Sequence, residues 1–379
     1  MKKIVFVLSH FPNPRIIKRI DTLKEKFDIT LIYWNRLVYD EKFSVDDRIN
    51  VVQVTIKAPI GNPFKRVFPL WKFKRRVEKH LKIINPDFLH IANLDMLLVT
   101  EKYVHKHKKV KTVYEIGDLG RYVFYKQNKF PKKTIYKYLV KKETKIISNS
   151  VENLIITSPY FFEKYYKNLF DANKTLFIPN VPRKKVFSSY SKKENKTFTI
   201  GFIGSVRYYQ NLVNLIEATN KSNYKINILI AGSGPSYKAI KEYIELNNIV
   251  NVEMYGPYNY QKDIVSLYER IDIVYSLYDA NNENVKIALP NRLYEAINCE
   301  LPIIVAKNTV LSDFVEKEKI GLSINSSDCS ELQDTIEEII KNNKLYDSFR
   351  VNAKNIKHKY QYEFYESKLM QIYLESYEF

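Results

Sequence analysis

Short runs of β-branched and aromatic residues alternate with longer amphipathic segments along this chain of 379 residues. In the first half the runs predict strands, and two of the segments between them carry apolar residues at helical spacing. The predicted strands cover residues 3–9, 28–34, 50–56, 87–92, 111–116 and 153–158, and the helices residues 14–27 and 134–150. This alternation predicts a parallel sheet covered by helices on both faces.

A polar, basic stretch at residues 183–196 interrupts the pattern, which then restarts. The second set of strands covers residues 197–204, 225–232, 251–256, 271–276 and 302–306, and the helices residues 211–219, 236–247, 261–270, 291–298 and 331–343. We therefore predict an α/β fold with two Rossmann-like, doubly wound domains at residues 1–185 and 198–355, joined by a linker at 186–197. An amphipathic helix within residues 356–379 is expected to pack back on the first domain.

The basic charge of the chain is concentrated in its first half. The net charge is +19, and residues 1–200 hold 42 Lys and Arg against 18 Asp and Glu, whereas residues 201–379 hold 19 against 24. An AT-rich genome would enrich lysine in both halves alike, so the asymmetry indicates a polyanion facing the first half. A lipid surface, nucleic acid and phosphorylated acceptors are the alternatives.

The sequence also limits the cellular setting. The apolar run after Met1 ends at Ser9 after five residues, which is too short for a signal peptide, and no run of about 18 apolar residues is present. The two cysteines, Cys299 and Cys329, have neither metal-ligand nor redox spacing. We expect a cytoplasmic, reduced protein without a transmembrane helix.

Three loops of the second domain are candidates for an anion site. Gly204 and Ser205 follow a predicted strand, and Arg207 stands before the next helix. A small-residue turn follows at 231–235, and a Pro290-Asn291 turn then presents a helix N-terminus. Glycine lets backbone N–H groups approach an anion, a guanidinium binds phosphate in bidentate fashion, and a helix N-terminus adds partial positive charge.

Two charged side chains follow that Pro-Asn turn. Arg292 begins the helix and Glu295 lies one turn further along the same face. The carboxylate of Glu295 suits the two hydroxyl groups of a ribose whose phosphates lie at the turn. The alternative is a surface ion pair between Arg292 and Glu295, worth about 0.2–0.5 kcal/mol.

The ordered motifs GFIGSVR, ILIAGSGP, VEMYGPY, IDIVYSLYD and LPNRLYEAINCELPIIVA resemble the GT-B glycosyltransferases, specifically the large retaining family 4. The resemblance covers nearly all of residues 198–330 and, more loosely, the first half. It implies a nucleotide sugar on the C-terminal domain and an acceptor on the N-terminal domain. Transfer would occur in the cleft between the domains with retention of anomeric configuration, without a metal or another cofactor.

The resemblance also implies roles for particular residues. Glu295 matches the family glutamate that contacts the donor ribose, whereas the first motif glutamate would fall at Ile287 and is missing. Ser205 and Gln210 occupy the positions of the usual basic pair. We therefore expect Arg207, helped by Lys286 or Arg292, to neutralise the departing diphosphate.

In the first domain, many relatives carry a histidine where this chain has Gly117. Asp118 or Glu115 is therefore expected to orient the acceptor or the sugar hydroxyls, and with Arg207 these form the expected catalytic set. A helix-capping role for Asp118 is the alternative. His10 and Arg15, after the first strand, are expected on the acceptor side. His90 lies inside a strand pattern and is better interpreted as a hydrogen-bonded core histidine.

A basic, aromatic segment at residues 65–82 is the candidate membrane contact. Its expected contact residues are Lys65, Arg66, Phe68, Trp71, Lys72, Phe73, Lys74, Arg75 and Arg76. A basic helix that carries aromatic residues is typical of the surface of an anionic membrane. No helix-turn-helix, zinc or RNA-recognition signature accompanies these charges, which argues against nucleic acid as the partner.

The predicted function is a glycosyltransferase bound peripherally to the inner face of the cell membrane. It would move a sugar from a nucleotide donor, expected to be UDP-linked, to a lipid-linked or oligosaccharide acceptor in the biosynthesis of a bacterial capsule, O-antigen or exopolysaccharide. The alternative is a catalytically degenerate sugar- or lipid-binding scaffold of the same fold, which Ile287 and Gly117 favour.

Overall fold

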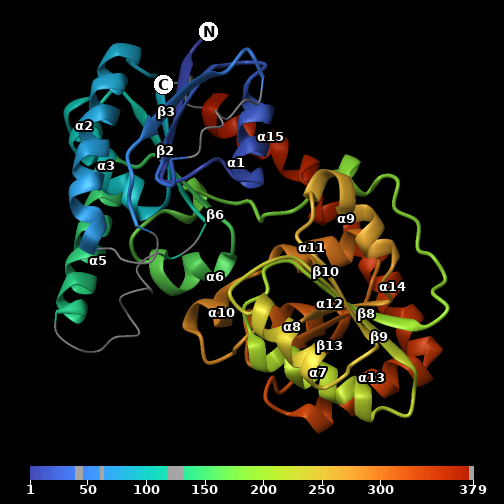
Figure 1. Ribbon diagram of the computed structural model, residues 1–379. Helices are drawn as coiled ribbons and strands as arrows, with labels where there is room; N and C mark the ends of the chain where they lie inside the picture. Colours follow the sequence, from blue (N-terminus) through green and yellow to red (C-terminus); the bar gives the residue numbers. More distant parts are fainter. Residues whose placement is uncertain (39–45, 60–63, 118, 120–130, 375–379) are drawn as a thin grey trace. The chain divides into compact units, whose positions relative to one another are not determined.

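The computed structural model describes residues 1–38, 46–59, 64–117, 119 and 131–374, and the chain divides into two compact units. Unit 1 comprises Met1–Pro179 and Tyr365–Phe379, and unit 2 comprises Asn180–Phe364. Each unit contains one sheet whose strands all pair in parallel, so the predicted α/β fold with two doubly wound sheets is confirmed (Figure 1).

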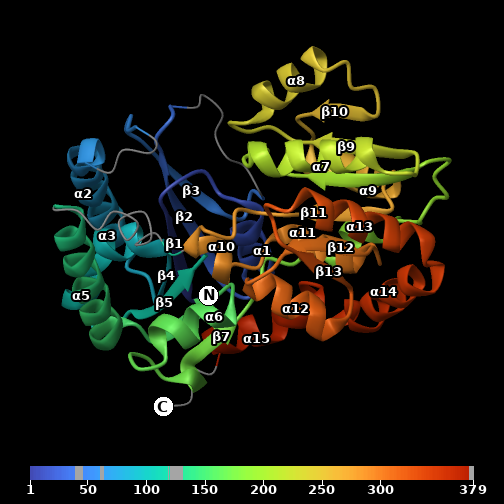
Figure 2. The same ribbon diagram turned by 90° about the horizontal axis from the view of Figure 1, so that it is seen from below.

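The sheet of unit 1 has seven strands in the order β3-β2-β1-β4-β5-β6-β7. These are β1 (Lys3–Leu8), β2 (Asp28–Asn35), β3 (Asn50–Thr55), β4 (Phe88–Ala92), β5 (Lys111–Ile116), β6 (Asn153–Ile156) and β7 (Thr175–Phe177). The helices are α1 (Pro14–Leu23), α2 (Val67–Ile84), α3 (Asn93–Lys106), α5 (Lys132–Ser150), α6 (Pro159–Phe161) and α15 (Glu363–Leu374). Helices α2, α3 and α5 cover one face of the sheet and α1 with α15 the other (Figures 1 and 2). Because both faces are covered, β4 is buried along its whole length.

The sheet of unit 2 has six strands in the order β10-β9-β8-β11-β12-β13. These are β8 (Phe198–Ile203), β9 (Ile226–Ala231), β10 (Val252–Gly256), β11 (Ile273–Ser276), β12 (Ile303–Ala306) and β13 (Gly321–Ile324). The helices are α7 (Tyr209–Lys221), α8 (Tyr237–Leu246), α9 (Tyr260–Glu269), α10 (Glu283–Ile287), α11 (Asn291–Asn298), α12 (Val310–Glu318), α13 (Cys329–Lys341) and α14 (Asn343–Ile356). The apolar sides of α7, α8 and α13 pack together on one face of the sheet.

The unit boundaries differ from the linker expected at 186–197. Unit 2 begins at Asn180, and the basic stretch is tied to this unit because Lys192 pairs with Asp272 at 2.7 Å and Lys193 with Glu269 at 2.6 Å. The end of the chain returns to unit 1 from Tyr365 onward, and residues 375–379 lie outside the described part.

In both sheets the strand order reverses beside the first strand. Strand β1 pairs with β2 on one side and β4 on the other, and β8 likewise pairs with β9 and β11. The loops at the carboxyl ends of such neighbouring strands diverge, and ligands of open α/β sheets bind in the crevice that results. The carboxyl ends of β8 and β11, and of β1 and β4, are therefore the places to look for a site.

Candidate functional site

The chain turns sharply after β8, and the turn is held against the following strand-end loop. Gly204 has φ +132°, its N–H donates to the carbonyl oxygen of Ala231 at 2.8 Å, and the N–H of Val206 donates to that of Ser233 at 3.0 Å. A Cβ atom at Gly232 would lie 1.9 Å from the carbonyl oxygen of Gly204. Two glycines therefore allow the two backbones to meet at the carboxyl edge of the sheet.

Arg292 lies against this turn. Its side chain comes from α11, is 5% exposed, and donates from Nε to the carbonyl oxygen of Ile203. The guanidinium carbon stands 3.7 Å from the centre of the Phe202 ring, and a Cβ at Gly204 would stand 3.0 Å from Nη2. The Nη1 atom is buried without a hydrogen-bond partner, and no ion pair joins Arg292 to a carboxylate of the described residues. An unsatisfied buried donor of a charged group is unfavourable, so this position suits an anionic ligand.

A second guanidinium borders the same turn. Arg207 is exposed and donates from Nε to Ser205 Oγ at 2.8 Å, and it makes no ion pair within the described part of the chain. The N-termini of α7 and α11, at Tyr208 and Pro290, have no side-chain cap. Two cations without carboxylate partners and two sets of free helix N–H groups make this edge attractive to phosphate.

A small cavity of about 130 Å³ lies beside the turn, at the carboxyl ends of β8, β11 and β12. Its polar lining includes Tyr208, Ser276, Tyr278, Asn284 and Thr309. Ser276 Oγ and Asn284 Oδ1 are buried and have no hydrogen-bond partner among the residues that the structure describes. Because buried polar groups are usually hydrogen-bonded, this cavity suits the hydroxyl groups of a ligand.

Glu295, one turn after Arg292, is held by Tyr268. Its side chain is 5% exposed, and Oε2 accepts a hydrogen bond from the Tyr268 hydroxyl at 2.8 Å. Burial, with the charge of Glu295, raises the pKa of Tyr260. Burial, with the charge of Glu295, raises the pKa of Tyr258 to about 12. No ion pair joins Arg292 to Glu295, so the alternative of a surface pair between them is wrong.

The other expected donor-side residues are engaged by other side chains. Lys286 pairs with Glu283 at 3.0 Å, and Gln210 donates to Asn214 Oδ1 at 2.9 Å. Asn291 Oδ1 accepts a hydrogen bond of 2.8 Å from Asn180. Lys286 therefore differs from Arg207 and Arg292, whose guanidinium groups make no ion pair with a residue in the described ranges.

In unit 1, the structure corrects the expected role of Glu115. This carboxylate is fully buried, 2.9 Å from Arg15 Nε, 3.5 Å from Arg19 Nε and 2.9 Å from His90 Nε2. Burial alone would raise the pKa of Glu115, but Arg19, Arg15 and His90 hold it well below its usual value. Glu115 cannot contact an acceptor. His90 also pairs through Nδ1 with the Tyr373 hydroxyl at 2.6 Å, which confirms the interpretation as a hydrogen-bonded core histidine.

Arg15 fills the space beside Gly117. A Cβ at Gly117 would lie 1.7 Å from Arg15 Nη1. Any side chain at residue 117 would therefore require Arg15 to move from its observed position. His10 is half-buried, and its Nδ1 lies 2.7 Å from the carbonyl oxygen of Phe11. Asp118 lies outside the described residues.

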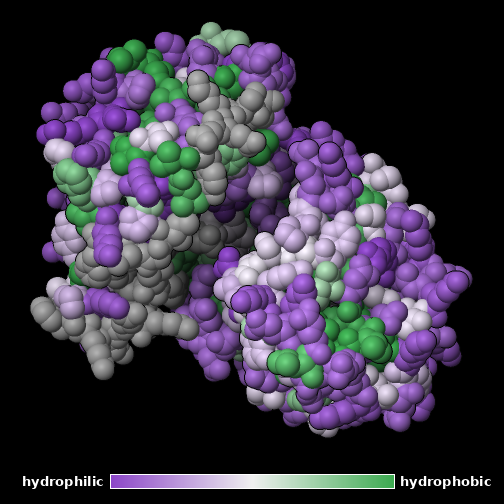
Figure 3. All heavy atoms as spheres, in the orientation of Figure 1, coloured by the Kyte–Doolittle hydropathy of each residue, from purple (hydrophilic) through white to green (hydrophobic). Residues whose placement is uncertain are grey.

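Helix α2 presents aromatic and basic side chains on its outer face. Phe68 and Trp71 are 62% and 45% exposed, with ring centres 5.9 Å apart. Lys72 Nζ stands 4.6 Å from the Phe68 ring centre, and Arg75 Cζ stands 3.8 Å from that of Trp71. The other cations of this face are Lys65 and Arg76, both exposed, and Arg66, which is half-buried. Figure 3 shows apolar side chains among hydrophilic ones on this side of unit 1.

Two of the expected contact residues lie on the inner face of α2. Phe73 is fully buried and stacks on Trp34 at 5.0 Å, and Lys74 Nζ donates to the carbonyl oxygen of Leu98 at 3.4 Å. The expected membrane contact of Phe73 is therefore wrong. None of the helices in the described ranges is long and apolar enough to cross a membrane.

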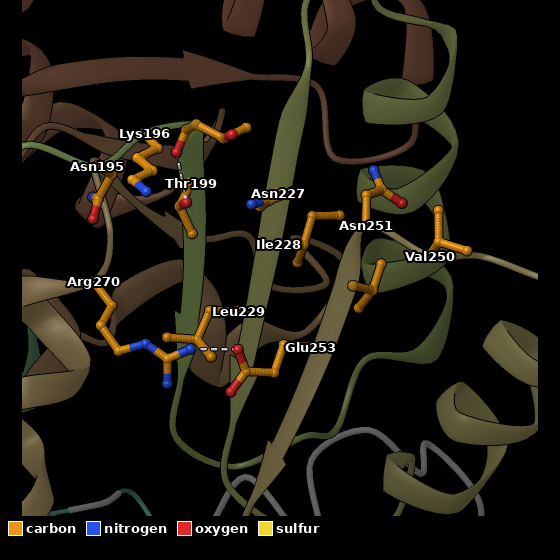
Figure 4. Close-up of a pocket in the computed structure, with 12 residues that line it drawn as sticks. Asn195, Lys196, Thr199, Asn227, Ile228, Leu229, Val250, Asn251, Glu253 and Arg270 are labelled. Atoms are coloured by element: carbon orange, nitrogen blue, oxygen red, sulfur yellow. Dashed lines mark hydrogen bonds and ion pairs between the residues drawn. The ribbon is translucent and has the colours of Figure 1, made fainter.

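A larger hollow of about 400 Å³ lies at the opposite, amino edge of the unit 2 sheet (Figure 4). Its lining includes Asn195, Asn227 and Asn251, together with Arg270, which pairs with Glu253. Since Arg270 is neutralised and the strand order does not open a crevice at this edge, the carboxyl edge is the better candidate.

Comparisons with known proteins show which family the two halves of the chain resemble. A family model described as "Glycosyl transferases group 1" matches residues 182–356, and one described as "Glycosyl transferase 4-like" matches residues 3–150. The chain is 25% identical over 349 residues to the succinoglycan biosynthesis protein ExoL of Rhizobium meliloti. The aligned region covers 88% of this chain and 83% of that protein.

Solved structures share the fold over almost the whole chain. Sucrose-phosphate synthase from Thermosynechococcus elongatus superposes with a TM-score of 0.77 at 14% identity, over 100% of this chain and 99% of that chain. HepE from Anabaena, solved in complex with UDP, superposes with a TM-score of 0.71 at 15% identity, over 99% and 100% of the two chains.

Proposed function

The chain belongs to the GT-B glycosyltransferases of the family 4 type, and we propose that it transfers a sugar from a UDP-linked donor to a saccharide acceptor in exopolysaccharide biosynthesis. The succinoglycan biosynthesis relative supports the pathway class, and the UDP complex of HepE supports the nucleotide. Unit 2 would bind the donor, and unit 1 would bind the acceptor.

One observation carries the proposal: Arg207 and Arg292 border the Gly204 turn and make no ion pair with any described carboxylate. A nucleoside diphosphate brings the negative charge that these cations lack. The charge on the leaving diphosphate grows as its bond to the sugar breaks, and fixed cations in a partly buried site stabilise that charge strongly. Loss of one such donor costs about 10²- to 10³-fold in rate in comparable oxyanion sites.

The remaining donor groups follow from the same geometry. Glu295, held by Tyr268 at 2.8 Å, would accept hydrogen bonds from the ribose hydroxyls. The cavity with the unpartnered atoms Ser276 Oγ and Asn284 Oδ1 would take hydroxyl groups of the transferred sugar.

We further propose that transfer retains the anomeric configuration. The acceptor oxygen would bond to the anomeric carbon on the side from which UDP departs, while the bond from that carbon to the diphosphate oxygen breaks. The acceptor proton would pass to the departing diphosphate oxygen, so the step needs no carboxylate base. The cations of Arg207 and Arg292 would supply the neutralisation, with no metal required.

The outer face of α2 supports a peripheral membrane location and a lipid-linked acceptor. Its exposed aromatic rings, Phe68 and Trp71, would enter the headgroup region. The cations that stand over these rings, Lys72 and Arg75, would contact anionic lipid. Each basic residue near such a surface contributes about 1 kcal/mol.

Binding followed by turnover tests the function. Thermal unfolding with UDP, GDP and dTDP should single out UDP, since a ligand of the native state stabilises it in proportion to RT ln(1 + [L]/Kd). Radiolabelled UDP-sugars with bacterial membranes should then yield labelled product with the wild-type chain. Arg270→Gln, on the opposite edge, should retain this activity, and Arg292→Gln should lose most of it. Stabilisation by UDP-sugars with no transfer would favour the non-catalytic scaffold instead.

A further inference from the structure

A second group of polar side chains lies at the carboxyl edge of the unit 1 sheet, where the strand order reverses beside β1. It is formed by Ser9 and His10 after β1, Arg36 after β2, Asp95 in the first turn of α3, and Arg66 just before α2. Four separate segments therefore place these groups at the carboxyl edge of one sheet. None of the residues proposed above to bind the donor lies in this unit.

The charges of this group converge without forming ion pairs. Asp95 Oδ1 accepts the N–H of Met96 at 3.2 Å. Neither Arg36 nor Arg66 makes an ion pair with a described carboxylate.

Other buried or half-buried charges of unit 1 form ion pairs with a residue of opposite charge. Glu115 lies 2.9 Å from Arg15 Nε, and Lys24 lies 2.9 Å from Asp46. Partly buried charges in proteins are usually paired, so charges that gather and stay apart indicate a ligand that fits between them.

The surroundings of Asp95 and Arg36 are only partly hydrated. Burial raises the pKa of Asp95, while the Ser9 hydroxyl and the charges of Arg36, His10 and Arg66 oppose this rise. Burial likewise lowers the pKa of Arg36. A ligand that hydrogen-bonds to Asp95 and pairs with Arg36 therefore gains more binding free energy here than it would at a fully solvated surface.

We propose that Asp95, Arg36 and Arg66 form the acceptor site, and that the acceptor is a phosphate-bearing saccharide. Asp95 accepts a hydrogen bond from an acceptor hydroxyl and orients it, and the two guanidinium groups bind the phosphate in bidentate fashion. Two arginines face one carboxylate, which leaves positive charge for the anion. The inference depends on the proposed function, since it identifies the second substrate of the same reaction.

Exposed apolar side chains on the same loops bear on the source of the phosphate. Phe11 after β1 is 39% exposed, and Leu37 after β2 is 47% exposed. They suit the lipid of a lipid-linked saccharide phosphate, whereas a free sugar phosphate would use only the polar groups. The experiment below distinguishes these two sources.

The alternative is that Asp95 only stabilises the N-terminus of α3, as an acid in the first turn does. Asp87 provides the matched control, because it also holds a backbone N–H group, that of Lys3 at 2.8 Å, but lies at the amino end of β4. Asp87→Asn and Asp95→Asn should therefore cost similar stability if both carboxylates are only structural.

The test measures kcat/KM for transfer from a radiolabelled UDP-sugar to three acceptor preparations from one bacterial lipid extract. These are the intact lipid-linked saccharides, their water-soluble saccharide phosphates, and the same phosphates after phosphatase treatment. Isothermal titration with UDP is run on every variant, because UDP binding belongs to unit 2.

Phosphatase treatment should lower kcat/KM of the wild-type chain about 10- to 100-fold, the size of a lost charged contact. Arg36→Gln should lose this dependence on phosphate, and Asp95→Asn should lower kcat/KM on all three preparations by a similar factor. Both variants should bind UDP within twofold of the wild type. A preference for the intact lipid over the soluble phosphates would identify the lipid-linked source, and equal rates would identify the phosphate alone.

If Asp95→Asn and Arg36→Gln matched Asp87→Asn within twofold on every preparation, the acceptor site would be refuted while the proposed function stood. If the wild-type chain transferred sugar to none of the preparations and UDP did not bind, the proposed function would fail, and this inference with it.

Discussion

The contact between Tyr268 and Glu295 offers a direct test of how the nucleotide is recognised. The Tyr268 hydroxyl donates to Glu295 Oε2 at 2.8 Å, and the tyrosine is fully buried. The variant Tyr268→Phe removes one hydroxyl without changing the ring. If Glu295 binds the ribose hydroxyls, this variant should leave the carboxylate less well oriented toward them.

The expected magnitude follows from the hydrogen bonds involved. A bond to a charged group contributes about 1.5–3 kcal/mol, so 2′-deoxy-UDP should bind the wild-type chain about 10- to 150-fold more weakly than UDP. In Glu295→Gln only a neutral acceptor remains, worth about 0.5–1.5 kcal/mol, and the ratio of the two dissociation constants should fall to about 2- to 12-fold. Tyr268→Phe should lie between these values, because Glu295 keeps its negative charge but loses the hydrogen bond that orients it.

Isothermal titration with the two nucleotides measures this ratio, and thermal unfolding measures the stability of each variant. Tyr275→Phe is the control, since Tyr275 is also fully buried in unit 2 and its hydroxyl donates to the carbonyl oxygen of Asn211 at 2.7 Å. This variant should lose stability but keep the wild-type ratio. An unchanged ratio in both Tyr268→Phe and Glu295→Gln would refute the assignment of Glu295 to the ribose.

Four further predictions concern other parts of the chain. Arg292→Gln should raise the Kd for UDP about 10- to 100-fold by titration, whereas Arg270→Gln stays within twofold; equal effects would contradict the diphosphate site. Excess EDTA should leave the rate of sugar transfer within twofold, and a loss restored by Mg²⁺ would show that a metal takes part. Glu115→Gln should lower the free energy of unfolding by about 3–5 kcal/mol at pH 7, because buried guanidinium groups lose their partner. Since the pKa of Glu115 is lowered from 4.5, this difference should be full above pH 4.5 and shrink on further acidification; a difference independent of pH would contradict the buried pair. Phe68→Ala with Trp71→Ala should weaken sedimentation with phosphatidylglycerol vesicles at least tenfold, and unchanged binding would exclude this face as the membrane contact.

The sequence pattern was sufficient for the fold class, because strands buried on both faces read as continuous apolar runs, but it missed the short strands β7 and β13 and helices such as α3 and α12. It was weaker where one helix has two functions. Trp71 and Phe73 are two positions apart, so at 100° per residue they lie on nearly opposite sides of α2. The buried series Phe73, Val77 and Leu81, at intervals of four, carried that information.

Side chains whose roles depend on distant partners could not be assigned from the sequence. Glu115 lies within a predicted strand, but its partners Arg15 and Arg19 come from α1, about a hundred residues earlier in the chain. The sequence pattern did not predict helix α3, so it gave Asp95 no place in the fold. Only the chain topology brings Asp95 to the same edge of the sheet as Arg36, which follows a different strand.

The partners of the buried arginines separate structural from ligand-binding cations in this chain. Arg15 and Arg19 both lie beside the carboxylate of Glu115, so each of them has an acidic partner within unit 1. Arg292 is similarly buried, but it has no carboxylate partner among the described residues; its neighbours are a carbonyl oxygen, aromatic rings and a glycine turn. An uncompensated buried charge destabilises the native state, and a scaffold without a ligand would be more stable with an apolar side chain at this position. Arg292 therefore argues for an anionic ligand in unit 2 despite the departures at Ile287 and Gly117, because the binding of an anion would offset the cost of its unpaired charge.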